Sequence, residues 1–70
     1  MSIGALTLKE LAALGVNLEI DGNYGALTLK EVVSIVVSKG GHITINSQNL
    51  GAFTLKELAA LGGKNITLKV

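Results

Sequence analysis

The side chains that could carry out chemistry are few, and they stand apart in the sequence. His42 is the single imidazole, and the chain has no cysteine. Nucleophilic catalysis requires a Ser or Cys beside a base that a carboxylate orients. Ser34 and Ser38 fall on a predicted helix, in the layer opposite the predicted strand that begins at His42. We therefore expect no catalytic triad, and we interpret His42 as a solvated surface residue, with a titrating contact as the alternative.

The carboxylates do not predict a metal or acid–base site either. Glu19 and Asp21 share one predicted strand, but two carboxylates without a histidine partner make a poor transition-metal site, and no calcium-loop spacing is present. Glu10, Glu31 and Glu57 recur at one position of a repeat, where helix capping explains them. The sequence therefore predicts a protein that is not an enzyme, with no catalytic, cofactor-binding or metal-binding residue and no cofactor.

The composition excludes several classes of partner. The 70 residues are 49% hydrophobic with a formal net charge of +1, which is typical of one small folded domain. All six basic residues are lysines and the aromatic residues are Tyr24 and Phe53, so nucleic acid is not an expected partner. No apolar run is long enough to span a bilayer. The first residues lack the pattern of a signal peptide, so we expect a cytoplasmic location.

One seven-residue segment occurs three times in the sequence, the third time with one substitution. Gly-Ala-Leu-Thr-Leu-Lys-Glu begins at Gly4 and at Gly25, and it returns at Gly51 with Phe53 in place of a leucine. In each copy a Thr precedes a Glu by three residues, the spacing of a capping box at a helix N-terminus. The three pairs are Thr7 with Glu10, Thr28 with Glu31, and Thr54 with Glu57. Apolar residues at the spacing of a hydrophobic staple flank each threonine: Leu6 with Leu11, Leu27 with Val32, and Phe53 with Leu58. We therefore predict that a helix begins at each threonine.

Glycines predict where these helices end. Gly15 and the pair Gly62-Gly63 would end two short helices, and the middle helix would continue to Gly40-Gly41. The segment Val32 to Val37 is rich in β-branched residues, which favour a strand by local propensity. We predict a helix there, because the same capping box precedes it and its apolar residues can share one helical face.

Each copy closes with a run in which apolar and polar residues alternate. The runs are residues 17–21, 42–46 and 65–70. The alternation predicts strands with one apolar, buried face (the dry face) and one polar, solvent-exposed face (the wet face). A strand–helix–strand connection within one sheet is right-handed and leaves its strands parallel. We predict an α/β fold in a single domain: a short two-layer solenoid of three helix–strand repeats, residues 3–21, 24–46 and 50–70, with three parallel strands and the helices on one face.

The wet face of the predicted sheet is the candidate interaction face. In register, the strands give the rows Asn17/His42/Asn65, Glu19/Thr44/Thr67 and Asp21/Asn46/Lys69. Charge along these rows runs from acidic on the first strand to basic on the third. The first strand of one chain could therefore lie beside the third strand of another, with Glu19 or Asp21 near Lys69. The predicted interaction residues are Glu19, Asp21, His42, Thr44, Asn46, Thr67 and Lys69.

Part of the chain resembles a leucine-rich repeat. The stretch from Ile43 to Leu50 has apolar residues at alternate strand positions, then an amide and an apolar residue, and a predicted helix follows it. Gln48 stands at the position of that family's asparagine, and Asn23 holds the position in the preceding copy. The resemblance implies helices on the convex side of a solenoid and a binding or scaffolding role, with the exposed sheet turned to a protein partner.

The size of the chain predicts association. A core of 70 residues is marginal, and without disulfides oligomerisation is the remaining means of stabilising it. The first and third strands would leave both edges of the sheet open, and open edges recruit further strands. We predict a non-enzymatic repeat module for protein–protein association or scaffolding, either a fragment of a longer solenoid or a homo-oligomer. The oligomer would be a dimer joined through residues 66–70, which Thr67→Pro would weaken by removing an edge N–H.

Two alternatives remain open from the sequence. The chain could be a ligand-binding or enzymatic subunit whose site forms between chains, and His42, Glu19 and Asp21 would then be the residues of interest. It could also be an engineered or truncated scaffold without a cellular role, because the segments 8–14 and 55–61 are such close copies.

Overall fold

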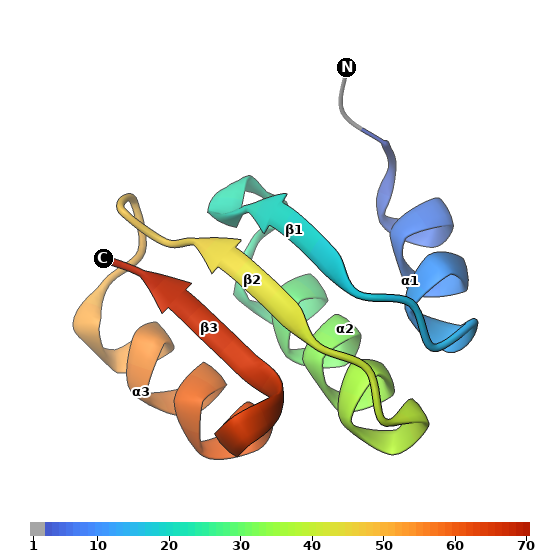
Figure 1. The fold of residues 1–70 in the computed structure, drawn as a ribbon. Helices are drawn as coiled ribbons and strands as arrows, with labels where there is room; N and C mark the ends of the chain where they lie inside the picture. Colours follow the sequence, from blue (N-terminus) through green and yellow to red (C-terminus); the bar gives the residue numbers. More distant parts are fainter. Residues whose placement is uncertain (1–2) are drawn as a thin grey trace.

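The computed structural model describes residues 3–70, in which helices and strands alternate along the chain (Figure 1). The elements are α1 (Ala5–Ala13), β1 (Leu18–Asp21), α2 (Ala26–Lys39), β2 (Ile43–Asn46), α3 (Ala52–Gly62) and β3 (Ile66–Lys69). Two single 3-10 turns, η1 (Gly22–Tyr24) and η2 (Gly63–Asn65), lead from β1 into α2 and from α3 into β3. None of the helices within residues 3–70 has the length and apolar character needed to cross a membrane.

The strands form one open parallel sheet in the order β1-β2-β3. Leu18 lies opposite Ile43, and Ile43 lies opposite Ile66, so the three apolar runs are in register. A helix separates each strand from the next along the chain, and this crossover lets neighbouring strands run in the same direction. The prediction of three parallel strands in sequence order is confirmed.

The core lies between the sheet and the helices. Figure 1 shows α1, α2 and α3 side by side against one face of the sheet. Ile43 and Ile45 of the central strand have no exposed surface, whereas Thr44 between them is partly exposed on the other face. The fully buried apolar residues are Leu8, Ala12, Leu29, Val32, Val33, Val36, Ile43, Ile45 and Leu58. The alternation along each strand therefore separates a dry face from a wet face, as expected.

The segment Val32 to Val37 is helical, as predicted against its local propensity. Val32, Val33 and Val36 are fully buried, and this burial offsets the small helical cost of β-branched side chains. The helix ends at Gly40, which has a φ of 75° and a left-handed conformation that other residues rarely adopt. The predicted glycine stop is therefore confirmed for α2.

The helix N-termini correct the predicted capping. The helices begin after the N-cap residues Gly4, Gly25 and Gly51. No side chain makes a capping hydrogen bond at any of these three helix N-termini. Each threonine is therefore the third residue of its helix, because glycine supplies the N-cap position three residues earlier. The capping-box prediction was therefore wrong: Thr7, Thr28 and Thr54 do not cap the helices that contain them.

The staple prediction was wrong for the same reason. Leu6, Leu27 and Phe53 are each the second residue of a helix and are 72%, 73% and 75% exposed, so they do not make the predicted staple contacts. Leu6 lies two residues before the buried Leu8, which places it about 200° around the helix from that residue. An earlier helix start therefore turns these three apolar side chains to solvent.

The repeated glutamates join neighbouring helices instead of capping them. Lys9 Nζ of α1 lies 2.8 Å from Glu31 Oε1 of α2. Lys30 Nζ of α2 lies 2.9 Å from Glu57 Oε1 of α3. The lysines Lys9 and Lys30 thus point toward the following helix, and the glutamates Glu31 and Glu57 point toward the preceding one. We call these two ion pairs the helix ladder.

Candidate functional site

The exposed face of the sheet brings the predicted interaction residues together. Glu19, Thr44 and Thr67 lie in one cross-strand row, with the residues of the next row in the same register. That next row consists of Asp21, Asn46 and Lys69. The period of two residues along each strand therefore predicted correctly which polar side chains share this face.

His42, just before β2, is hydrogen-bonded to residues on both sides of it, one just before β1 and one in β3. Its Nε2 lies 2.8 Å from Thr67 Oγ1, a hydrogen bond whose direction follows the imidazole tautomer. Its backbone N–H donates to Asn17 Oδ1 at 3.2 Å. Asn65 Nδ2 donates to the carbonyl of Gly41 at 2.9 Å, which adds a third cross-strand bond at this end of the sheet. Within residues 3–70 no three His, Asp or Glu side chains converge on a possible metal position.

The charges on the sheet face meet within one chain. Lys69 Nζ lies 2.9 Å from Glu19 Oε2, so an ion pair passes over the central strand from β3 to β1. Within the single chain these two residues pair with each other, because Lys and Glu side chains are long enough to span a sheet of this width. Asp21 makes no ion pair with any residue from 3 to 70.

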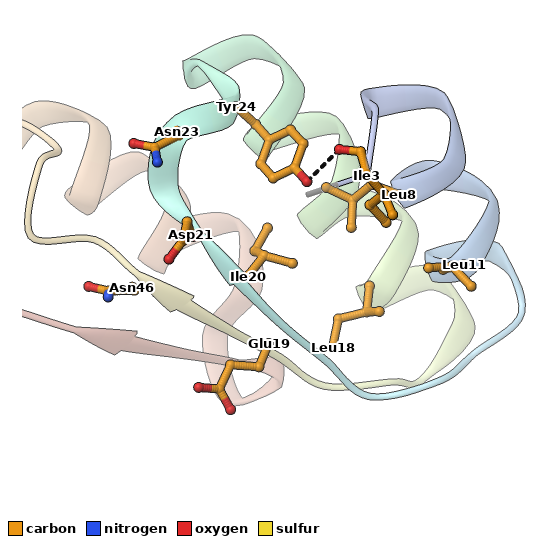
Figure 2. A pocket seen from close by; sticks show the side chains of 10 residues that line it. All are labelled: Ile3, Leu8, Leu11, Leu18, Glu19, Ile20, Asp21, Asn23, Tyr24 and Asn46. Carbon is orange, nitrogen blue, oxygen red and sulfur yellow. Dashed lines mark hydrogen bonds between the residues drawn. The ribbon is translucent and has the colours of Figure 1, made fainter. Parts of the chain in front are cut away.

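A groove of about 630 Å³ lies beside β1, between that strand and α1 (Figure 2). We call it the edge groove. Its lining residues are Ile3, Leu8, Leu11, Leu18, Glu19, Ile20, Asp21, Asn23, Tyr24 and Asn46. Tyr24 Oη donates to the carbonyl of Ile3 at 2.7 Å, which connects the segment before α1 to the turn after β1. Sequence reasoning placed Glu19 and Asp21 on the interaction face but did not identify the apolar wall beside them.

The turns after β1 and β2 also meet. Asn49 Nδ2 donates to Asn23 Oδ1 at 2.7 Å, and the two amides line a smaller pocket of about 180 Å³. Gln48 holds the asparagine position of the resemblance to leucine-rich repeats, yet it is exposed and Asn49 makes this contact. The amide that bridges the turns is therefore one residue further along the chain.

The hydrogen bonds of β3 show which backbone groups face its free edge. The backbone N–H and the Oγ of the buried Ser47 both donate to the carbonyl of Lys69, at 3.0 and 2.9 Å. Lys69 therefore turns its backbone toward β2, and the period of two residues turns Thr67 the same way. The N–H groups at the free edge belong to Ile66 and Leu68, so the expectation that Thr67→Pro removes an edge N–H was wrong.

Two free sides of the stack thus stand out as possible binding surfaces, the edge groove beside β1 and the outer edge of β3. They lie at the two opposite edges of the sheet, because β2 separates β1 from β3. Comparison with protein-family models, curated proteins and solved structures finds no match to this chain.

Proposed function

We propose that this chain is a non-enzymatic repeat module for protein–protein association that self-associates through the free sides of its stack. The observation that carries the proposal is the open sheet, in which β1 and β3 are each paired on one side only within residues 3–70. Edge strands present unpaired N–H and C=O groups, which pair readily with a strand of another chain. In this proposal, residues 3–21, 24–46 and 50–70 are the units of a short solenoid, and association continues the stack.

Exposed apolar side chains support the same proposal. Leu14, just after the outermost helix α1, and Val70, just after the outermost strand β3, are 74% and 86% exposed. A chain of this size buries only a small core, so covering such side chains in an assembly adds stabilisation that the single chain lacks.

Light scattering coupled to size exclusion, over a range of micromolar concentrations, tests self-association. We expect a mass above 7.2 kDa that rises with concentration. The midpoint of the thermal transition should rise as well, because association stabilises the folded state by mass action. A species of 7.2 kDa at every concentration, with a thermal transition independent of concentration, would contradict self-association.

The edge groove favours a second candidate function, the binding of a small ligand. A volume of about 630 Å³ falls in the usual range for small-molecule sites, roughly 300 to 1,000 Å³. Leu11, Leu18 and Ile20 provide apolar walls, and Asp21 at the rim carries a negative charge. These features fit a ligand with an apolar body and a cationic head.

A thermal-shift series of alkyl and aryl amines, with the corresponding alcohols as uncharged controls, tests this candidate. Binding in the edge groove predicts a shift for the amines that Asp21→Asn removes and Thr44→Ala leaves unchanged, because Thr44 does not line the groove. Equal shifts for amines and alcohols would contradict recognition of the cationic head.

A further inference from the structure

The first and last helices are almost the same peptide. Residues 5–15 and 52–62 are identical except that Leu6 is replaced by Phe53. The two helices lie at opposite ends of the row of helices, and α2 lies between them (Figure 1). Each therefore has one side covered by α2 and one side free. The covered side of one helix should correspond to the free side of the other.

The helix ladder shows which side is which. On α1, Lys9 faces α2, and Ala5 and Ala12 share its stripe because they are four residues before and three residues after it. On α3, Glu57 faces α2, so the copy of that stripe points away from α2. We call this copy, together with the adjacent leucine, the tail flank: Ala52, Leu55, Lys56 and Ala59.

The free side of α1 follows from the same argument. On α3, Thr54 and Leu61 share the stripe of Glu57, which faces α2. The equivalent stripe on α1 points away from α2. We call this stripe, together with the adjacent leucine, the head flank: Thr7, Glu10, Leu11 and Leu14.

The burial of equivalent residues confirms this assignment of the flanks. Ala12 on the covered side of α1 has no exposed surface, whereas its copy Ala59 on the tail flank is exposed. Leu58 on the covered side of α3 has none, whereas its copy Leu11 on the head flank is partly exposed. Leu14 on the head flank is 74% exposed, against 43% for its copy Leu61.

The charges of the two flanks are complementary. Lys56 of the tail flank and Glu10 of the head flank are exposed, and neither makes an ion pair with any residue from 3 to 70. They are the copies of Lys9 and Glu57, which do form ion pairs in the helix ladder. The two flanks are thus the two halves of a helix contact that already occurs inside the chain.

We propose that a second copy of this chain covers these flanks head to tail, with the tail flank of one copy against the head flank of the next and Lys56 paired with Glu10. This inference rests on the proposed self-association and names its partner and its geometry. In the register of the existing sheet, Ile66 of one copy would lie opposite Leu18 of the next, with the strands parallel. The edge groove, with Leu11, Leu18 and Ile20, would then be covered by the neighbouring copy.

This geometry sets the form of the assembly. A head-to-tail contact is heterologous, so a dimer still exposes one head flank and one tail flank. The dimer is therefore the smallest product, and growth continues to a ring or an open chain. The exposed ion pair contributes more to orientation than to affinity, because exposed pairs are weak, and apolar contacts and strand pairing supply the rest.

A charge-reversal cycle tests the proposed pair. Glu10→Lys and Lys56→Glu each place like charges across the contact, so each variant alone should associate about tenfold more weakly than the original chain. The double variant restores opposite charges and should associate like the original, and so should an equimolar mixture of the two single variants. Lys39→Glu makes the same change in net charge as Lys56→Glu but lies on α2, away from both flanks, and should leave association unchanged.

Cross-linking tests the direction of the contact. The chain has no cysteine, so single cysteines introduced by Glu10→Cys and Lys56→Cys report one contact each. A short bis-maleimide should cross-link a mixture of the two variants but neither variant alone. Ser34→Cys, on the exposed face of the middle helix, is the control that should not cross-link. Cross-linking of Lys56→Cys with itself would overturn the head-to-tail geometry in favour of a two-fold dimer.

The outcomes separate this inference from the proposed self-association. The original chain could form oligomers that charge reversal does not weaken and that show no cross-link between the two cysteine variants. That result would overturn the head-to-tail contact and leave self-association intact. A mass of 7.2 kDa for the original chain at every concentration would overturn both, and it is the result expected if another protein covers the flanks. Circular dichroism of each variant shows whether a loss of association reflects unfolding instead.

Discussion

Lys69 Nζ lies 2.9 Å from Glu19 Oε2, although β2 separates the strands that carry these residues. The ion pair therefore joins the two outer strands over the face of the central one. It also neutralises, within the chain, two of the charges in the acidic-to-basic gradient across the sheet, whereas Asp21 makes no ion pair within residues 3–70. On the helices, Glu10 and Lys56 make no ion pair within residues 3–70, so their charges remain available to a neighbour.

We expect the coupling between Glu19 and Lys69 to be small. Their side chains are 70% and 53% exposed, and exposed ion pairs contribute about 0.2 to 1 kcal/mol. A double-mutant cycle with Glu19→Gln and Lys69→Gln, measured by urea unfolding, should give a coupling free energy in that range. Concentrated salt should remove it. Glu19→Gln with Lys39→Gln should be additive, and a coupling of several kcal/mol for the first pair would contradict this account.

Thr7→Ala should leave the free energy of unfolding nearly unchanged. Thr7 is the third residue of α1 and is exposed, so the change should fall within about 0.5 kcal/mol. Loss of a threonine that caps a helix would cost about 1 kcal/mol, and up to about 2. Urea unfolding at fixed protein concentration distinguishes the two, and a loss above about 1 kcal/mol would restore the capping-box interpretation.

Gly51→Ser should stabilise the fold. Gly51 is an N-cap residue with extended backbone angles (φ −74°, ψ 162°), and an added Cβ atom would meet no atom within 4 Å. A serine there can accept a hydrogen bond from the first turn of α3, a gain of a few tenths of a kcal/mol. Gly25→Ser is the matched control and should destabilise, because Gly25 has a φ of 84°. Equal effects of the two substitutions on the urea midpoint would show that the N-cap backbones are alike.

Truncating the leucines of α1 and α3 to alanine should destabilise the fold, and the more costly of the two positions should differ between the two helices. Leu8→Ala should cost about 2 to 5 kcal/mol and Leu11→Ala less, because Leu8 is fully buried and Leu11 is only partly buried. In α3 the order reverses, since Leu58 is fully buried and Leu55 only partly. Unfolding at low protein concentration, where the chain is a monomer, measures both orders. The same order in both helices would contradict the covered and free sides assigned to them.

Head-to-tail docking adds a concentration dependence to that result. Leu11 and Leu55 belong to the head and tail flanks, so their truncation should become more costly where copies associate. The costs of Leu8→Ala and Leu58→Ala should not change, because those residues are already buried in the single chain. Thermal transitions at low and high concentration give the comparison.

The strands and the helix ends were predictable because their signals are local. A period of two residues marked β1, β2 and β3 and correctly separated Ile43 and Ile45 from Thr44. Gly40 ended α2 because few other residues adopt its left-handed backbone. Such signals depend on a few neighbouring residues and not on the rest of the chain.

The helix starts and the roles of the glutamates were not predictable in this way. A Thr followed three residues later by Glu fits a capping box, and it equally fits the first turn of a helix that a glycine caps. Glu31 is paired with Lys9 because α1 lies beside α2, which is a property of the packed helices. The sequence pattern is the same in both cases, and the partner of each glutamate depends on the position of the neighbouring helix.

By itself, the sequence determined which segments are helices, which are strands, and which face of each strand is apolar. It could not determine which leucine of the repeated segment is buried, because the residues from Thr7 to Leu14 and from Thr54 to Leu61 are identical. The tertiary structure buries Leu8 in the first copy and Leu58 in the last. Burial depends on which side of a helix has a neighbour, and α2 lies on opposite sides of two identical peptides.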